Sequence, residues 1–314
     1  MTLDYDIIVI GGGHAGCEAA SAAARLGSRT LLLTMDMTKM AAMSCNPAVG
    51  GVAKGQIVRE IDALGGEMGR ITDRTAVQFR MLNMSKGAAM WSPRAQCDKT
   101  RFSEEWRHTL ENTPNLYIWQ DAATELLFEN ANEASSADLE EKRDNTPEAA
   151  EAHAAESQKT VVRPTADHPE EKALSSDLAA ENRSETSRLR IRGIRTRMGV
   201  TFSCRAVVLT AGTFLDGMMH CGAAHAEGGR AGDAASHGIT ACLTRIGFET
   251  GRMKTGTPAR LDARTIHFEH LEPQYGDEKP SKFSFSPDTE PVKDQMPCYL
   301  VYTTPEVHAI LRSG

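Results

Sequence analysis

The sequence lacks several features that would point to particular classes of protein. No run of about 18 apolar residues occurs, so a membrane-spanning helix is not expected. The first residues, MTLDYD, contain no basic stretch of the kind that begins a signal peptide. Seven cysteines are scattered without a CxxC pair, which argues against a zinc ribbon or a dithiol redox centre and favours a reducing compartment. We therefore expect a cytoplasmic protein without a metal site.

The chain also lacks the excess of positive charge that is typical of a nucleic-acid-binding protein, because its formal net charge is -7. Much of the acidity lies in residues 130–187, which contain 14 acidic residues against 6 basic ones and no Phe, Trp or Tyr. A segment of this composition buries too little apolar surface to offset the entropy lost on folding. We predict a flexible, disordered acidic insertion that extends a surface connection after the strand near Asn115.

A glycine-rich turn is the clearest motif. Residues 6–16 read DIIVIGGGHAG, a buried strand that runs into a turn, and an alanine-rich helix and a second strand, SRTLLLT, follow. Gly11, Gly13 and Gly16 form the pattern GxGxxG in this context. The first glycine permits the tight turn, the second lets the backbone approach a pyrophosphate, and the third lets helix and strand pack closely. This unit predicts an α/β fold with a dinucleotide site.

The carboxylate that usually binds the adenosine ribose is expected at the end of the second strand. Thr34 stands there and Asp36 comes two residues later, so the sequence leaves the ribose contact open. Hydrophobic periodicity and strand-like runs predict the remaining elements. These are helices over residues 52–64 and 99–112, and strands over residues 115–119, 188–196 and 204–215.

Cys45 lies in the stretch MSCNPAVGGVAKG, whose proline and glycines indicate a loop that leads into a helix. Reactive thiols and anion sites are typical of such places. A packing cysteine normally has apolar neighbours, whereas Cys45 is flanked by Ser44 and Asn46. We interpret Cys45 as a functional thiol, and an inert packed thiol is the alternative.

Eight motifs together resemble the N-terminal half of the GidA/MnmG family of flavoproteins. They are GGGHAGCEAA, MSCNPAVGGVAKG, REIDALGG, NMSKGAAM, RAQCD, AVVLTAGTFLDG, GGRAGD and GRMKTGTPAR. The resemblance implies a Rossmann-like FAD-binding fold of the glutathione-reductase type with an inserted β-rich or α+β domain. It divides the chain into an FAD-binding domain of residues 1–129 and 188–240, the acidic insertion 130–187, and the incomplete start of the inserted domain in residues 241–314.

The chain also departs from the family pattern. Family members are much longer and carry a second functional cysteine beyond the point at which this chain ends, ILRSG. Cys298 matches a different family position and is not that cysteine. Ala88 stands where members more often have proline.

The resemblance implies an enzyme that modifies the wobble uridine of tRNA. A homodimer would work with a GTPase, as a heterotetramer, to install an aminomethyl or carboxymethylaminomethyl group at C5 of uridine 34. FAD would be bound, methylenetetrahydrofolate would supply the carbon, glycine or ammonium the amine, and NADH the reducing power. Cys45 would add to C6 of uracil as a thiolate, which activates C5, or would assist by acid–base chemistry.

The same resemblance, with the glycine pattern, assigns candidate residues. For the cofactor they are Gly11, Gly12, Gly13, His14, Ala15, Gly16, Ala123 and Ser236. For tRNA they are Arg252, Lys254 and Arg260, because three cations and two glycines within the ten residues GRMKTGTPAR suit a loop that faces phosphates. Lys54, Lys86 and Arg94 are further loop cations that can grip phosphates.

Two other functions stay open at this point. One is that of the folate- and FAD-dependent tRNA uridine-54 methyltransferase, which shares the fold and the glycine fingerprint. The other is that of a non-catalytic flavin-binding fragment. The SCNPAVGG and KTGTPAR loops favour the wobble-uridine enzyme over the methyltransferase.

Overall fold

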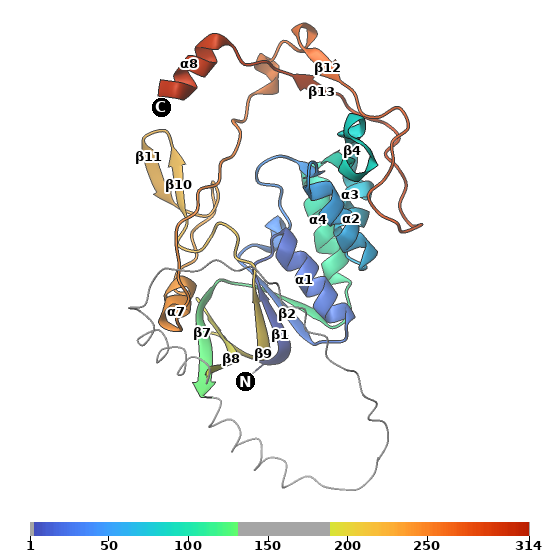
Figure 1. Ribbon diagram of the computed structural model, residues 1–314. Coiled ribbons are helices and arrows are strands. Elements are labelled where there is room, and N and C mark those ends of the chain that lie inside the picture. The colour runs from blue at the N-terminus through green and yellow to red at the C-terminus, as the bar shows by residue number, and fades with distance from the viewer. Residues whose placement is uncertain (1–2, 131–188, 314) are drawn as a thin grey trace, which may run out of the picture.

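The computed structural model describes residues 3–130 and 189–313, and its centre is a six-stranded sheet in the order β6-β2-β1-β9-β8-β7 (Figure 1). The strands β6, β2, β1 and β9 are parallel, and β8 runs antiparallel to β9 and to β7. The sheet is made of β1 (Leu3–Ile10), β2 (Thr30–Thr34), β6 (Leu116–Gln120), β7 (Ala123–Asn130), β8 (Leu189–Thr196) and β9 (Thr201–Leu209).

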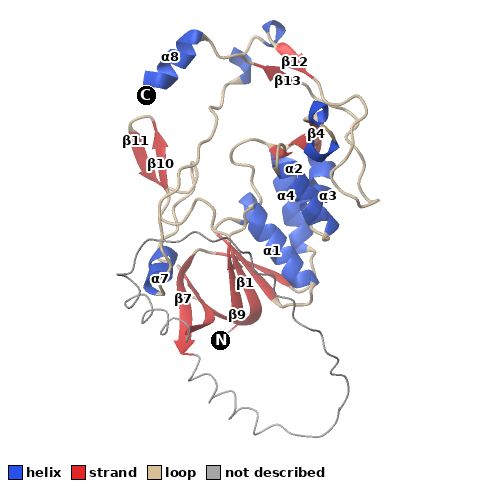
Figure 2. Ribbon diagram, in the orientation of Figure 1, coloured by secondary structure: helices blue, strands red, loops and turns tan. Residues whose placement is uncertain are grey.

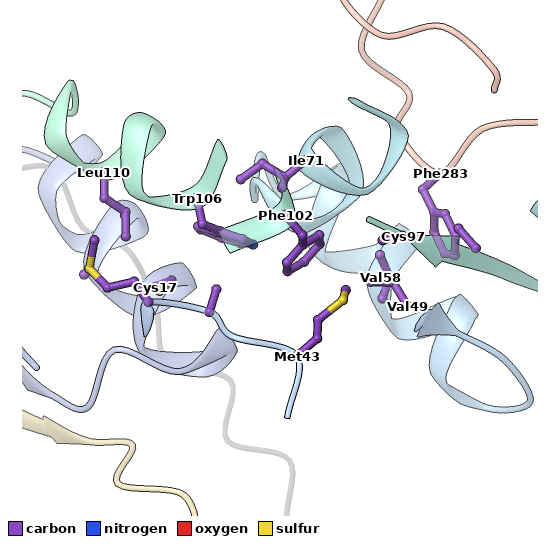
Figure 3. Close-up of a cluster of buried hydrophobic side chains, with 14 of the residues drawn as sticks. Cys17, Met43, Val49, Val58, Ile71, Cys97, Phe102, Trp106, Leu110 and Phe283 are labelled. Atoms are coloured by element: carbon purple, nitrogen blue, oxygen red, sulfur yellow. The ribbon is translucent and has the colours of Figure 1, made fainter. Parts of the chain in front are cut away.

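Helices cover both faces of this sheet. On one face α1 (His14–Arg25) and α4 (Lys99–Glu111) pack with Val9 and Leu32, and the fully buried Trp106 and Phe102 fill the space between them (Figure 3). On the other face α7 (Ile239–Arg245) packs with the alternate strand residues, such as Ile8 and Leu31. The alternation of side chains along each strand therefore builds two separate cores.

A second, antiparallel sheet extends from the helical side, in the order β3-β5-β4 (Figure 2). Its strands are β3 (Ala48–Gly50), β4 (Ala76–Leu82) and β5 (Ser92–Cys97), with α2 (Lys54–Ala63) and α3 (Met68–Thr75) packed against it. The β10–β11 hairpin, the pair β12–β13 and α8 lie apart from the main sheet (Figure 1). Their bounds are Met218–Cys221, Ala224–Glu227, Glu272–Gln274, Cys298–Leu300 and Pro305–Ser313.

Short 3-10 turns complete the described elements. They are η1 (Met37–Lys39), η2 (Met84–Lys86), η3 (Ala88–Met90), η4 (Ala263–Thr265) and η5 (Phe268–His270).

The predicted α/β, Rossmann-like fold is confirmed, and the three predicted helices form, as α1, α2 and α4. Strand β7 was not predicted, and the expected place of the acidic stretch was therefore wrong. The acidic stretch does not follow the strand near Asn115; it connects β7 to its antiparallel neighbour β8, and it lies outside the described residues. The strand predicted over 204–215 ends at Leu209, because Gly212 turns the chain with a φ of +59°. The proposed domain boundaries stay predictions.

Residues 282–289, here called the strap, pack against the small sheet β3-β5-β4. The Asp73 carboxylate accepts hydrogen bonds from the backbone N–H of Phe283 at 2.7 Å and of Ser284 at 2.9 Å, and from the Thr289 hydroxyl at 2.9 Å. These bonds seat the fully buried Phe283 ring edge-on against Phe79, with centroids 5.8 Å apart. Desolvation raises the pKa of Asp73, and its hydrogen bonds oppose that shift.

We expect Asp73→Asn to lower the free energy of unfolding by about 2–3 kcal/mol, because an amide cannot accept all three bonds and presents donors to donors. Urea denaturation would measure the loss, and limited proteolysis would show cleavage at residues 282–289. Asp288→Asn is the matched control, because this carboxylate on the same strap is mostly exposed. Equal stability of the two variants would contradict the anchoring role of Asp73.

Candidate cofactor and cysteine site

The turn that follows β1 and the turn that follows β9 are in close backbone contact at the carboxyl ends of these strands. Gly11 has a φ of +110°, and a Cβ added to it would lie 2.5 Å from the carbonyl oxygen of Thr210. A Cβ added to Gly16 would overlap the carbonyl oxygen of Gly11. The Thr210 hydroxyl donates to the carbonyl oxygens of Ile10 and Gly11, both at 3.0 Å. Gly11 and Gly16 are therefore required by close backbone packing, as the motif predicted.

Gly13 has a different environment, because it precedes α1 and faces open space. A Cβ added to it would meet no atom within 4 Å, and no side chain caps the helix at this residue. The first-turn N–H groups of a helix have no acceptors within the helix, and they carry its positive partial charge. The turn thus offers room and donors for an anion such as the pyrophosphate of a dinucleotide.

Gly12 and His14 contribute to the turn by packing. A Cβ on Gly12 would lie 2.7 Å from Oγ1 of Thr34, so glycine is needed for contact with β2. The His14 ring nitrogen Nε2 lies 3.0 Å from the carbonyl oxygen of Ala41, and the ring meets Phe102 edge-on. Desolvation lowers the pKa of His14, and the bond to Ala41 opposes this. The imidazole of His14 thus contacts the adjoining loop, although the residue stays exposed, and its contact with a cofactor stays a prediction.

A charged network borders the end of β2. Asp36 accepts from the backbone N–H of Thr38 at 2.8 Å, and Lys39 lies 3.3 Å from Asp36. Lys39 also pairs with Asp233, which in turn binds Arg230 at 2.6 Å. The hydrogen bond from the Thr38 hydroxyl is the largest cause that lowers the pKa of Asp36. This network joins the β2 loop to the GGRAGD segment, and no local sequence pattern predicts it, because Lys39 and Asp233 lie 194 residues apart. The ribose contact stays a prediction.

Ala123 and Ser236, assigned from the family resemblance alone, lie together. The Ser236 hydroxyl donates to the carbonyl oxygen of Ala123 at 3.4 Å, and Ser236 forms a parallel bridge with Leu215. The backbone N–H of Asp216 donates to the carbonyl oxygen of Ser236 at 2.9 Å. The two residues therefore meet beside the turn that follows β9.

Cys45 meets the segment 252–260, which carries the three candidate tRNA-binding cations. Arg260 donates to the carbonyl oxygen of Ser44 at 2.8 Å, and the half-buried sulfur of Cys45 lies 4.0 Å from the carbonyl oxygen of Gly256. Arg252 donates to the carbonyl oxygen of Asp216 at 3.1 Å, and Lys254 is exposed. The segment thus runs from the turn after β9 to the cysteine loop.

The other cysteines differ in their surroundings. Burial raises the pKa of the thiols of Cys17 and Cys97 to about 12 and that of Cys204 to about 11, so these thiols stay protonated. The candidate cations Lys54, Lys86 and Arg94 belong to the region of the small sheet and not to the segment 252–260. Cys298 donates to Oε1 of Gln78 at 3.5 Å.

A family model described as "Glucose inhibited division protein A" matches residues 6–314. The chain belongs to this family. It is 49% identical to the tRNA uridine 5-carboxymethylaminomethyl modification enzyme MnmG of Bacteroides thetaiotaomicron and 48% identical to that of Phocaeicola vulgatus, in each case over 314 residues. These matches cover all of this chain and 41% of each relative, so the chain spans about two fifths of their length.

A solved structure of a family member agrees with the assignment of the chain to this family. GidA from Aquifex aeolicus superposes with a TM-score of 0.76 at 40% identity, covering 99% of this chain and 43% of that one. The Rossmann-like architecture expected from the family is therefore the observed one. Among residues 3–130 and 189–313, no helix has the length and apolar character to cross a membrane.

We expect Gly16→Ala to destabilise the protein strongly, by roughly 2–4 kcal/mol, because the methyl group must displace backbone at the junction of β1 and α1. Gly13→Ala should leave stability within about 1 kcal/mol of the starting protein, since its methyl group enters open space. Thermal and urea unfolding of the two variants would make the comparison. Similar losses at both positions would show that the turn is not packed as described.

Proposed function

We propose that the protein is an FAD-dependent enzyme that installs an aminomethyl or carboxymethylaminomethyl group at C5 of the wobble uridine of tRNA. The observation that carries the proposal is the contact of the cysteine loop with the cationic segment 252–260, next to the glycine turn. The names of the curated relatives support the same reaction and do not favour the uridine-54 methyltransferase. A flavin-binding fragment without activity is the outcome that the experiments below would expose.

The glycine turn fits FAD in two respects. The space in front of Gly13 and the first-turn amides of α1 suit a pyrophosphate, and the neighbouring Ala123 and Ser236 suit the remainder of the nucleotide. Bound FAD supplies the redox chemistry, for which NADH is the proposed reductant. The chain's own part is to hold the cofactor at the edge of the sheet where the cysteine loop begins: the backbone N–H of Ala41 donates to the carbonyl oxygen of Gly12 at 2.8 Å.

Cys45 is the residue that we propose acts on the base. C5 of uracil is a weak nucleophile, and addition of a thiolate to C6 moves electron density to C5, which can then attack the carbon derived from methylenetetrahydrofolate. Loss of the proton from C5 and departure of the thiolate from C6 then restore the base. Proton transfer by the Cys45 thiol is the alternative role. Arg260, which donates to the carbonyl oxygen of the neighbouring Ser44, is the proposed contact for a phosphate of the anticodon loop.

The proposal extends to the assembly. A homodimer that works with a GTPase, as a heterotetramer in the cytoplasm, follows from the family resemblance. So does the division into an FAD-binding domain, 1–129 and 188–240, and an inserted domain that begins at residue 241. Glycine or ammonium would supply the amine.

We expect Gly13→Val to abolish flavin binding, because a branched side chain would occupy the path of the pyrophosphate. The flavin content of the purified variant, measured from its visible absorbance, would test this, with the melting temperature as the control for folding. Normal flavin stoichiometry would remove the cofactor from this turn. A Gly13→Val variant that folds normally but lacks flavin, beside an unchanged protein that binds flavin, would support the assignment of the cofactor to this turn.

We expect Cys45→Ser to keep the melting temperature and flavin content close to those of the starting protein while wobble-uridine modification collapses. The loop and solvent can satisfy the serine hydroxyl, whereas serine is a poor nucleophile. Mass spectrometry of nucleosides from the tRNA of cells whose only copy carries the change would measure the modification. Cys221→Ser is the matched control, because that thiol is exposed on the β10–β11 hairpin. Persisting modification would disprove the chemical role, and loss of flavin or of folding would make Cys45 structural.

A further inference from the structure

The β10–β11 hairpin carries two histidines directly opposite each other. His220 pairs with His225 across the antiparallel strands, next to the turn at Gly222, which has a φ of +58°. Their Nδ1 atoms are 2.8 Å apart and their ring centroids 4.5 Å apart, and both side chains are exposed. An exposed hydrogen bond between imidazoles contributes little to stability, so folding gives no strong reason for the pair.

The separation of the two nitrogens matches the bite of a chelated metal ion. Two nitrogens bound at about 2.0 Å and at right angles to each other lie about 2.8 Å apart, whereas a tetrahedral ion separates them by about 3.3 Å. We propose that His220 and His225 form a two-imidazole site for a divalent transition metal of tetragonal geometry, Cu²⁺ or Ni²⁺. Without metal, one Nδ1 carries the proton of the shared hydrogen bond; when metal binds, that ring takes its proton on Nε2 instead, by exchange with solvent, and both Nδ1 lone pairs are left to the ion.

The hairpin holds the pair ready for binding. The strand register runs from Cys221 opposite Ala224 to Met218 opposite Glu227, so the histidines cannot slip apart without breaking the ladder. Glu227 lies two residues from His225 and therefore on the same face of the hairpin, but its carboxylate lies 3.7 Å from Nε2 of His237 and is not counted as a ligand. Water would complete the coordination, because no group of three or more His, Cys, Asp or Glu side chains in residues 3–130 and 189–313 could hold a metal ion.

The experiment is a calorimetric titration of the purified, untagged protein with Ni²⁺. We expect one site, and we expect both His220→Ala and His225→Ala to weaken it by at least about tenfold, because each removes a ligand held at high effective concentration by the hairpin. His108→Ala is the matched control, since that exposed histidine lies on α4, and its affinity should equal that of the starting protein. Circular dichroism checks that the alanine variants keep their fold.

A spectroscopic measurement decides which atoms bind. Electron paramagnetic resonance of the Cu²⁺ complex, in a Cys221→Ser background that prevents oxidation of the neighbouring thiol, should show coupling to two equivalent nitrogens. Three results would each overturn the proposal. They are unchanged Ni²⁺ affinity in either His220→Ala or His225→Ala, loss of affinity in Cys221→Ser, and a spectrum that shows coupling to a single nitrogen. Because the titration needs neither flavin nor tRNA, its result is independent of the proposed enzymatic function.

Discussion

The close approach of the turn after β1 to the turn after β9 determines the arrangement of the whole candidate site. Gly16 packs on the carbonyl oxygen of Gly11, and Gly11 packs on that of Thr210, so no side chain can separate these three backbone segments. The contact fixes the N-terminus of α1 at the carboxyl edge of the parallel strands, where α/β sheets bind ligands. The cysteine loop depends on it as well, because Ala41 is hydrogen-bonded to Gly12 only four residues before Cys45.

Charge is distributed unequally around this edge. Lys39 and Arg230 are neutralised by Asp36 and Asp233, and their bonds hold two loops together. Arg260 instead donates to a neutral carbonyl oxygen, that of Ser44, so its positive charge is not cancelled by this bond. The first group of cations therefore serves the structure, whereas Arg260 keeps a field that can attract phosphate even in a chain whose net charge is -7.

Local patterns predicted the parts of the fold that local forces determine. The unit from β1 to β2 follows from a buried strand, a glycine turn and an alanine-rich helix, all within 34 residues. Contacts between distant residues could not be predicted this way: Ser236 reaches Ala123 across 113 positions, and Arg260 reaches Ser44 across 216. The strand β7 was missed because its buried pattern depends on pairing with β8, beyond the acidic stretch. The contacts of His14 with Ala41 and Phe102 could not be predicted either, because they also join distant parts of the sequence.

The cysteine that ends the motif GGGHAGC shows how packing keeps negative charge away from the N-terminus of α1. The Cys17 sulfur lies 3.4 Å from the carbonyl oxygen of Gly12, inside the first turn of α1, and burial raises its pKa to about 12. A thiolate at this place would face the carbonyl oxygen and offset the positive end of the helix. The protonated thiol instead donates to that oxygen and leaves the helix N-terminus available to an anion. Burial therefore keeps the Cys17 thiol protonated, whereas Cys45 is only half-buried, so of these two cysteines the one in the loop is the candidate for a reactive thiol.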